Sequence, residues 1–205
     1  MSVKRFDQAA AQWDEKPSRV VMAEAVADTI RRSVPLHSEM QALEFGCGTG
    51  LVGFSLLENL GSLDGIDAAE GMIAAFNEKA AAAGLAHRAK GEVRDIFGAP
   101  LQKRYDLIFS SMVFHHLPNP AEGACVLAKL LKAGGYLAIA DLDEEDGTFH
   151  PPEADGVHHF GFSSGEMEDF LRGADLEVIG VEEAHTVSKN GREYRIHLAV
   201  GRRKE

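Results

Sequence analysis

The feature that most constrains the fold is LEFGCGTG at residues 43–50, where three glycines follow closely on an apolar run. Glycine has no Cβ and adopts positive φ without strain, so this segment suits a tight turn that another group approaches closely. In α/β folds, the turn from the first strand into its helix presents free backbone N–H groups at the positive end of the helix dipole. The segment therefore predicts a strand, a turn and a helix, with a nucleotide-like ligand at the turn.

Apolar segments without polar alternation continue along the chain, as expected of strands that are covered on both faces. They occupy residues 40–45, 63–66, 105–110 and 135–140, and a shorter one ends near Arg94. Helical patterns lie between them at residues 50–60, 70–83 and 120–131, each followed by a glycine. The alternation predicts an α/β fold with a doubly wound, Rossmann-like, mostly parallel sheet.

The last quarter of the chain departs from this alternation. A helical pattern at residues 163–172 precedes two β patterns at residues 176–187 and 193–200, which the turn dipeptide Asn190-Gly191 separates. A tight hairpin joins only antiparallel strands. We therefore expect a seven-stranded sheet with an antiparallel strand at its C-terminal end.

Composition excludes several classes of partner. The length of 205 residues fits a single domain, and the net charge of −11 opposes binding to nucleic-acid phosphates. No apolar run approaches the length that membrane insertion needs. Neither a secretory signal nor a disulfide framework is visible, which predicts a cytoplasmic protein.

The glycines alone fit two kinds of nucleotide cofactor. Gly46, Gly48 and Gly50 form GxGxG, whereas Gly48, Gly50 and Gly53 form the GxGxxG dinucleotide fingerprint. Asp67 follows the second predicted strand about 20 residues later, where a carboxylate binds ribose hydroxyls in either case. Asp67 could also serve as the N-cap of the helix that begins near residue 70.

A family resemblance separates the two readings. The ordered motifs LEFGCGTG, GIDAAEGMI, EVRDIF, YDLIFSSMVFHHLP and LLKAGGYLAIADLD resemble those of class I S-adenosylmethionine-dependent methyltransferases, notably the small-molecule ubiquinone–menaquinone type. The resemblance covers most of residues 6–141 and implies S-adenosylmethionine as cofactor and S-adenosylhomocysteine as product. The cofactor-binding residues that it implies are Glu44, Gly46, Cys47, Gly48, Gly50, Asp67, Ala68, Met72, Asp95, Ile96 and Ser110. Packing for Met72 and Ile96, a helix cap for Asp95 and a small buried side chain for Cys47 stay open as alternatives.

The N-terminal segment FDQAAAQWDE resembles the FDxxAxxYD lead-in of many small-molecule methyltransferases, where it folds over the cofactor as a helical lid. Trp13 stands at the position where tyrosine is usual. Its indole can cover a cationic sulfonium through the π face. An amphipathic helix anchored by Phe6 and Trp13 is the structural alternative.

The residues that act on the acceptor are less constrained by sequence. His115 and His116 follow the fourth predicted strand and are candidates for a general base, with a purely structural role as the alternative. The irregular stretch at residues 143–162 carries His150, His158, His159 and Phe160, and such long loops often shape substrate sites. Its histidines and carboxylates could hold a metal, but their spacing matches no ligand motif, so the sequence assigns none.

We accordingly divide the single domain into a lid at 1–35, a cofactor-binding core at 36–142, a substrate loop at 143–162, and a C-terminal helix and hairpin at 163–205. The expected activity is in-line methyl transfer to a small-molecule acceptor, which needs chiefly the alignment of donor and acceptor. The alternatives are an NAD(P)-dependent oxidoreductase and a catalytically idle, cofactor-binding partner protein. The identity of the acceptor and the oligomeric state stay open.

Overall fold

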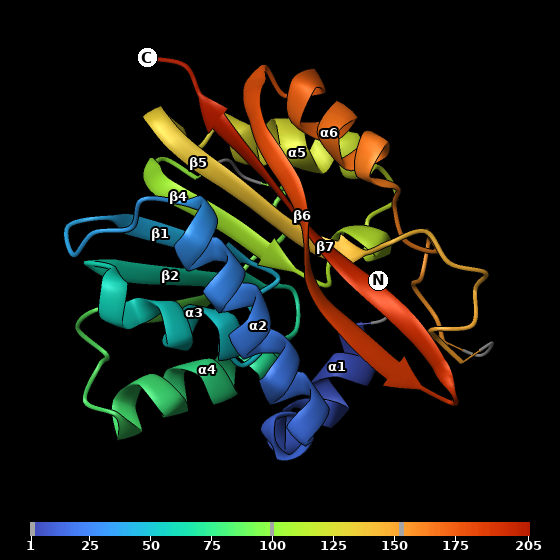
Figure 1. Ribbon diagram of the computed structural model, residues 1–205. Coiled ribbons are helices and arrows are strands. Elements are labelled where there is room, and N and C mark those ends of the chain that lie inside the picture. The colour runs from blue at the N-terminus through green and yellow to red at the C-terminus, as the bar shows by residue number, and fades with distance from the viewer. Residues whose placement is uncertain (1–2, 99–100, 152–153) are drawn as a thin grey trace.

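A mixed seven-stranded sheet in the order β3-β2-β1-β4-β5-β7-β6 forms the centre of the molecule (Figure 1). The computed structural model describes residues 3–98, 101–151 and 154–205. The strands are β1 (Gln41–Phe45), β2 (Ser62–Asp67), β3 (Ala89–Val93), β4 (Tyr105–Ser111), β5 (Leu131–Leu142), β6 (Leu176–Lys189) and β7 (Arg192–Arg203). Strand β7 runs antiparallel to both of its neighbours, β5 and β6, as the sequence predicted.

Helices cover both faces of the sheet. Helices α2 (Pro17–Ser33), α3 (Leu51–Leu56) and α4 (Glu70–Ala82) bury residues in one hydrophobic cluster, and α5 (Pro120–Ala128) and α6 (Ser164–Gly173) bury residues in a second cluster. The N-terminal α1 (Val3–Ala9) lies against α4, and three short 3₁₀ helices complete the fold: η1 (Ala10–Glu15), η2 (Leu57–Asn59) and η3 (Phe114–His116). The doubly wound architecture expected from the alternation of patterns is confirmed.

The structure differs from the expected elements chiefly at their ends. The helix expected at residues 50–60 is divided into α3 and η2, and the helix expected at 120–131 ends at Ala128. Leu131 begins β5 instead and is almost fully buried in the second cluster. Burial of this side chain in the sheet outweighs the helical periodicity of the preceding residues.

Local chemistry sets the C-terminal elements. The side chain of Ser163 accepts a hydrogen bond from the Glu166 N–H, and the Glu166 carboxylate accepts one from the Ser163 N–H, so a capping box begins α6. Asn190 and Gly191 have φ of 53° and 74°, the left-handed pair that a two-residue hairpin needs. The hairpin predicted from this dipeptide is therefore present between β6 and β7.

The order of strands reverses between β1 and β4, and this switch point positions the site. Open α/β sheets bind ligands outside the carboxyl ends of the strands at such a point. The turns that follow β1, β2, β3 and β4 all meet there, together with the loop that follows β5. Among the described residues, no helix combines the length and the apolar character that crossing a membrane requires.

Candidate active site

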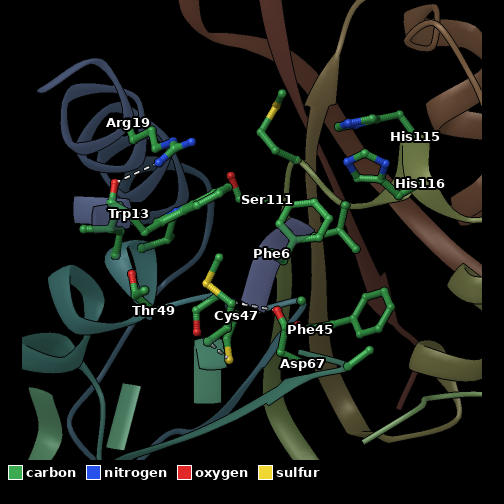
Figure 2. Close-up of a pocket in the computed structure, with 18 of the residues that line it drawn as sticks. Phe6, Trp13, Arg19, Phe45, Cys47, Thr49, Asp67, Ser111, His115 and His116 are labelled. Atoms are coloured by element: carbon green, nitrogen blue, oxygen red, sulfur yellow. Dashed lines mark hydrogen bonds between the residues drawn. The ribbon is translucent and has the colours of Figure 1, made fainter. Parts of the chain in front are cut away.

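A cavity of about 650 Å³ lies at this edge of the sheet. Its volume is within the range of small-molecule and cofactor sites. Figure 2 shows Cys47 and Asp67 on one side of it and His115 and His116 on another, with Phe6 between them in this view. We call the part around Cys47 and Asp67 the glycine-turn side. It consists of the end of β1 with the turn that follows, the end of β2, one residue of α4 and the segment after β3: residues 44–49, Asp67, Ala68, Met72 and residues 94–97. The second part is the histidine cluster, which consists of His115, His116 and His150.

The three glycines of the turn have positive φ but different surroundings. A Cβ on Gly46 would lie 2.3 Å from Val113 Cγ2, and one on Gly50 would lie 2.6 Å from the Phe76 ring. A Cβ on Gly48 would meet only Met72 Sδ, at 3.8 Å, so the backbone of Gly48 faces open space. Gly48 is thus the glycine that gives a ligand access to the main chain, whereas Gly46 and Gly50 permit close packing.

Asp67 ends β2 and bonds the glycine turn. Its Oδ2 accepts a hydrogen bond from the Gly48 N–H at 2.9 Å, and its Oδ1 accepts one from the Ala69 N–H at 2.9 Å. The N-cap position of α4 is Ala69, so Asp67 is not the N-cap itself. Burial raises the pKa of Asp67, and the N–H groups of Ala69 and Gly48 oppose this rise. Each oxygen keeps a further lone pair for a ligand.

Glu44 is buried near the end of β1 and borders the cavity. Its Oε2 has no hydrogen-bond partner among the described residues. Burial raises the pKa of Glu44 to about 8, opposed by the Gly53 N–H and the Lys79 charge. Burial, reinforced by the negative charges of Glu44 and Asp67, also raises the pKa of Cys47, so this thiol is protonated at neutral pH. An unpartnered buried carboxyl beside a cavity is a site that a cationic ligand satisfies.

Apolar side chains form the adjoining wall. Ala68, Met72 and Ile96 border the cavity, and Met72 and Ile96 are also part of the hydrophobic packing. Asp95 lies next to Ile96 on the exposed side, where its Oδ1 accepts a hydrogen bond from the Phe97 N–H at 2.9 Å. The arrangement offers a flat ring an apolar slot with a carboxylate at its edge.

The N-terminal segment is bonded to both the glycine turn and α4. Asp14 accepts a hydrogen bond from Thr49 Oγ1 at 2.6 Å and pairs with Lys79 Nζ at 2.6 Å. Asp7 accepts one from the Gly71 N–H at 2.9 Å. In this position the segment closes one side of the cavity, as a lid would.

Trp13 borders the cavity from this segment, but one face of its ring is already covered. The Arg19 guanidinium carbon lies 3.5 Å from the ring centroid, and Arg19 Nη1 donates to the Trp13 carbonyl at 3.1 Å (Figure 2). Phe6 packs against Trp13 and edge-on to His116, with ring centroids 5.8 and 5.6 Å away. The aromatic pair therefore connects the lid to the histidine cluster.

His115 is anchored to a carboxylate inside the sheet. Asp141 in β5 is fully buried, and its Oδ1 lies 2.6 Å from His115 Nδ1, while Oδ2 accepts from the His115 N–H at 3.2 Å. Burial would raise the pKa of Asp141, but the charge and hydrogen bonds of His115 and the Leu142 N–H lower it. Asp141 is therefore an acceptor, and His115 Nδ1 carries the proton between them.

The other two histidines complete the cluster. His116 donates from Nδ1 to the Gly156 carbonyl at 2.7 Å, because a carbonyl only accepts. His150 reaches in from the loop after β5, with its Nε2 3.1 Å from His115 Nε2. Burial, followed by the charge of His115, lowers the pKa of His116 to about 4 and that of His150 to about 3.

Several residues that the sequence predicts to bind cofactor or substrate do not border the cavity. Ser110 is buried and donates from Oγ to the Phe45 carbonyl at 2.9 Å, and its neighbour Ser111 borders the cavity instead. Gly50 packs against Phe76, as described above. His158, His159 and Phe160 do not border the cavity either: the two histidine N–H groups bond the His115 carbonyl, and Phe160 is exposed.

Sequence reasoning missed the anchoring role of Asp141. An acid inside the otherwise apolar LAIADL stretch was the available signal, because a buried carboxylate needs partners. It also missed Arg19 and Thr49, whose roles depend on contacts between distant segments.

Comparison with known proteins agrees with this geometry. Residues 43–137 match the family model of a methyltransferase domain. An uncharacterized methyltransferase of Schizosaccharomyces pombe is 34% identical over 72% of this chain and 58% of its own length. A malonyl-[acyl-carrier protein] O-methyltransferase of Bacillus anthracis is 30% identical over 69% of this chain and 52% of its own length.

A solved structure shares the fold over nearly the whole chain. The complex between the Haloferax volcanii Trm112 methyltransferase activator and the putative methyltransferase contains a chain that matches with a TM-score of 0.78. The two chains are 18% identical, and the match covers 98% of each, so this likeness shows the fold alone.

The fold and the glycine-turn site define a class I methyltransferase architecture. The chain is similar to S-adenosylmethionine-dependent methyltransferases of this class in its motif order, in the family model that matches residues 43–137 and in its relatives. It spans little more than half the length of the two curated relatives described above.

Proposed function

We propose that this protein transfers a methyl group from S-adenosylmethionine to a small-molecule acceptor inside the cavity. The observation that carries the proposal is that one cavity joins the glycine-turn side to the histidine cluster. Donor and acceptor could thus lie in line within one cavity, and this alignment is the main requirement of a displacement at a sulfonium methyl.

The glycine-turn side suits S-adenosylmethionine as the donor. The open backbone at Gly48 gives room for the ligand, and Asp67 offers oxygen lone pairs to ribose hydroxyls. Glu44, with its unpartnered oxygen, would accept a hydrogen bond from the ammonium group of the methionine portion, and that positive charge would favour the ionised carboxylate. Ala68, Met72 and Ile96 would hold the adenine, and Asp95 would accept from its amino group.

The histidine cluster supports the assignment of the acceptor to the opposite side of the cavity. His115, His116 and His150 are there with Ser111 and Met112. Met112 has a φ of 59°, which is unusual for a residue other than glycine. Residues with such backbone angles are often found at functional sites. His115 and His116 remain the candidates to contact the nucleophile of the acceptor. His150 is the histidine of the loop after β5 that borders this part of the cavity.

A binding assay tests the proposal directly. Calorimetric titration should give one site per chain for S-adenosylmethionine and for S-adenosylhomocysteine, and none for NADH. Incubation with methyl-labelled donor and a panel of small hydroxy, thiol and amino compounds should transfer label to one class. Tight NADH binding without donor binding would refute the assignment.

An idle cofactor-binding protein is the second candidate, and the match to a methyltransferase chain from a Trm112 complex favours testing it. Donor binding with no label transfer to any acceptor, together with a stoichiometric protein partner in pull-downs, would establish it. Turnover of the donor in the acceptor panel would reject it.

A further inference from the structure

The histidine cluster has the construction of a metal site. Each of His115, His116 and His150 offers one ring nitrogen, and the three nitrogens lie within 4.8 Å of one another. The nearest pair, His115 Nε2 and His150 Nε2, is 3.1 Å apart. Two imidazole nitrogens on one tetrahedral zinc ion lie roughly 3.3 Å apart, given bonds of about 2.0–2.1 Å.

The surroundings of the rings fix which nitrogen faces the others. His115 Nδ1 is held by Asp141 and His116 Nδ1 by the Gly156 carbonyl, so both Nδ1 atoms are occupied as donors. Their Nε2 atoms are left with lone pairs. Metal-binding histidines show this arrangement, in which a carboxylate or carbonyl outside the ligand shell sets the tautomer and orientation of the ring.

The cluster also leaves a coordination position open. All three histidines border the cavity, so a fourth ligand would come from the space where the acceptor is proposed to lie. Three protein ligands with one open position are typical of catalytic zinc sites, whereas structural sites are closed by four protein ligands. Imidazole ligands favour zinc, copper, iron or nickel over magnesium and calcium.

We propose that His115, His116 and His150 bind one divalent transition-metal ion, most simply Zn²⁺, whose open position binds the oxygen or sulfur nucleophile of the acceptor. Asp141 is a positioning residue that acts through His115. The inference rests on the proposed methyl transfer and names the acceptor class: a small molecule with an ionisable O–H or S–H group.

The metal would lower the pKa of that group. The acceptor then loses its proton to water, and its electron pair forms the bond to the methyl carbon. The carbon–sulfur electron pair stays on sulfur, which converts the sulfonium to a neutral thioether. Neither oxidant nor reductant is needed.

The test is metal binding to protein that carries no affinity tag and has been treated with a chelator. Zn²⁺ titration should give one site per chain, and Co²⁺ should give the visible bands of a tetrahedral site. The variant His150→Ala should weaken Zn²⁺ binding at least about tenfold, and Asp141→Asn should weaken it by about 10–100-fold with the Co²⁺ spectrum kept. His87→Ala is the matched control, since His87 is exposed in a turn outside the cavity, and its affinity should equal that of the parent.

Unchanged Zn²⁺ affinity in His150→Ala, or no stoichiometric binding to the parent, would overturn the inference. A metal-free hydrogen-bond chain from Asp141 through His115 to His150 would then be the remaining arrangement. Melting curves of the metal-free variants show whether each one is folded, and the half-buried His150 is chosen because its removal disturbs the core least. Donor binding by the same metal-free samples separates this outcome from failure of the proposed function, because the donor site contains none of the three histidines.

Discussion

The glycine-turn side and the histidine cluster face one cavity, yet they are built differently. On the glycine-turn side the main chain forms much of the surface: Gly48 exposes its backbone, and Asp67 bonds the Gly48 and Ala69 N–H groups. The histidine cluster consists of side chains from the short helix η3 and from the loop after β5, and His115 and His150 are 35 positions apart in the sequence. A nucleotide site formed by the main chain depends on the fold itself. Side chains outside the regular elements, in contrast, can be substituted without a change of fold.

The largest effect is expected where the two regions meet, at Gly46 and Val113. Gly46→Ala adds a Cβ within 2.3 Å of Val113 Cγ2 at a φ of 66°. Positive φ and overpacking together should cost about 3–4 kcal/mol of unfolding free energy and abolish measurable donor binding. Urea unfolding and donor titration measure both.

The double variant Gly46→Ala/Val113→Ala tests the cause. Removal of the valine methyls should relieve the clash but not the backbone strain. The double-mutant cycle of unfolding free energies should therefore show a favourable coupling of about 1–2 kcal/mol between the two substitutions. Additive losses would mean that the two regions do not constrain each other at this contact.

This contrast also explains what the sequence could predict. Strand, turn and acid recur at fixed spacings around Gly48 and Asp67, so local patterns predicted the architecture and the turn, whereas the other residues proposed for this side came from the family resemblance. Ser110 and Ser111 point to opposite faces of β4 because adjacent side chains of a strand alternate, so Ser110 bonds the Phe45 carbonyl and Ser111 borders the cavity.

The second effect concerns the buried carboxyl of the glycine-turn side. Burial raises the pKa of Glu44 to about 8 in the folded protein, while the Gly53 N–H and the Lys79 charge oppose this rise and the Asp67 charge adds to it. Because this pKa lies above the unfolded value, the stability from the protonated group is present below about pH 4.5 and is lost as pH rises through about 8.

Glu44→Gln removes this titration, so its unfolding free energy should fall less with pH than that of the parent. The difference between the two proteins should change by about 4 kcal/mol from pH 5 to pH 8.5. Urea unfolding across this range measures it. Parallel pH profiles would show that Glu44 is already ionised and partnered.

The third effect is chiefly on the affinity for the methyl donor. Asp67→Asn keeps an oxygen acceptor but loses the charge that strengthens hydrogen bonds to ribose hydroxyls, so donor affinity should fall about thirtyfold, or ~2 kcal/mol. The melting temperature without donor should also fall, but by less than donor affinity, because the Asn NH2 group replaces one of the two oxygens that accept from the Gly48 and Ala69 N–H groups. Asp64→Asn on the same strand is the control, since Asp64 bonds Lys103 and Tyr105 away from the cavity. A large loss of stability with donor affinity unchanged would assign Asp67 to the fold instead.

The histidine cluster could not be predicted in the same way. Sequence spacing grouped His150 with His158 and His159, but the loop directs the latter two to backbone contacts outside the cavity. His150 instead meets His115 and His116, which follow a different strand. Contacts between loops depend on the whole fold, and no local period encodes them.

The smallest expected effect on donor affinity belongs to this cluster. His150→Ala removes a ring that packs against His115, His116 and Phe149, and these three residues lie outside the glycine-turn side. Donor affinity should therefore stay within about twofold of the parent, since sites without shared contacts behave additively. Methyl transfer in the acceptor panel should nevertheless be lost. If donor affinity fell together with methyl transfer, the two sides of the cavity would be energetically coupled. The glycine-turn side and the histidine cluster would then act as one site and not as two.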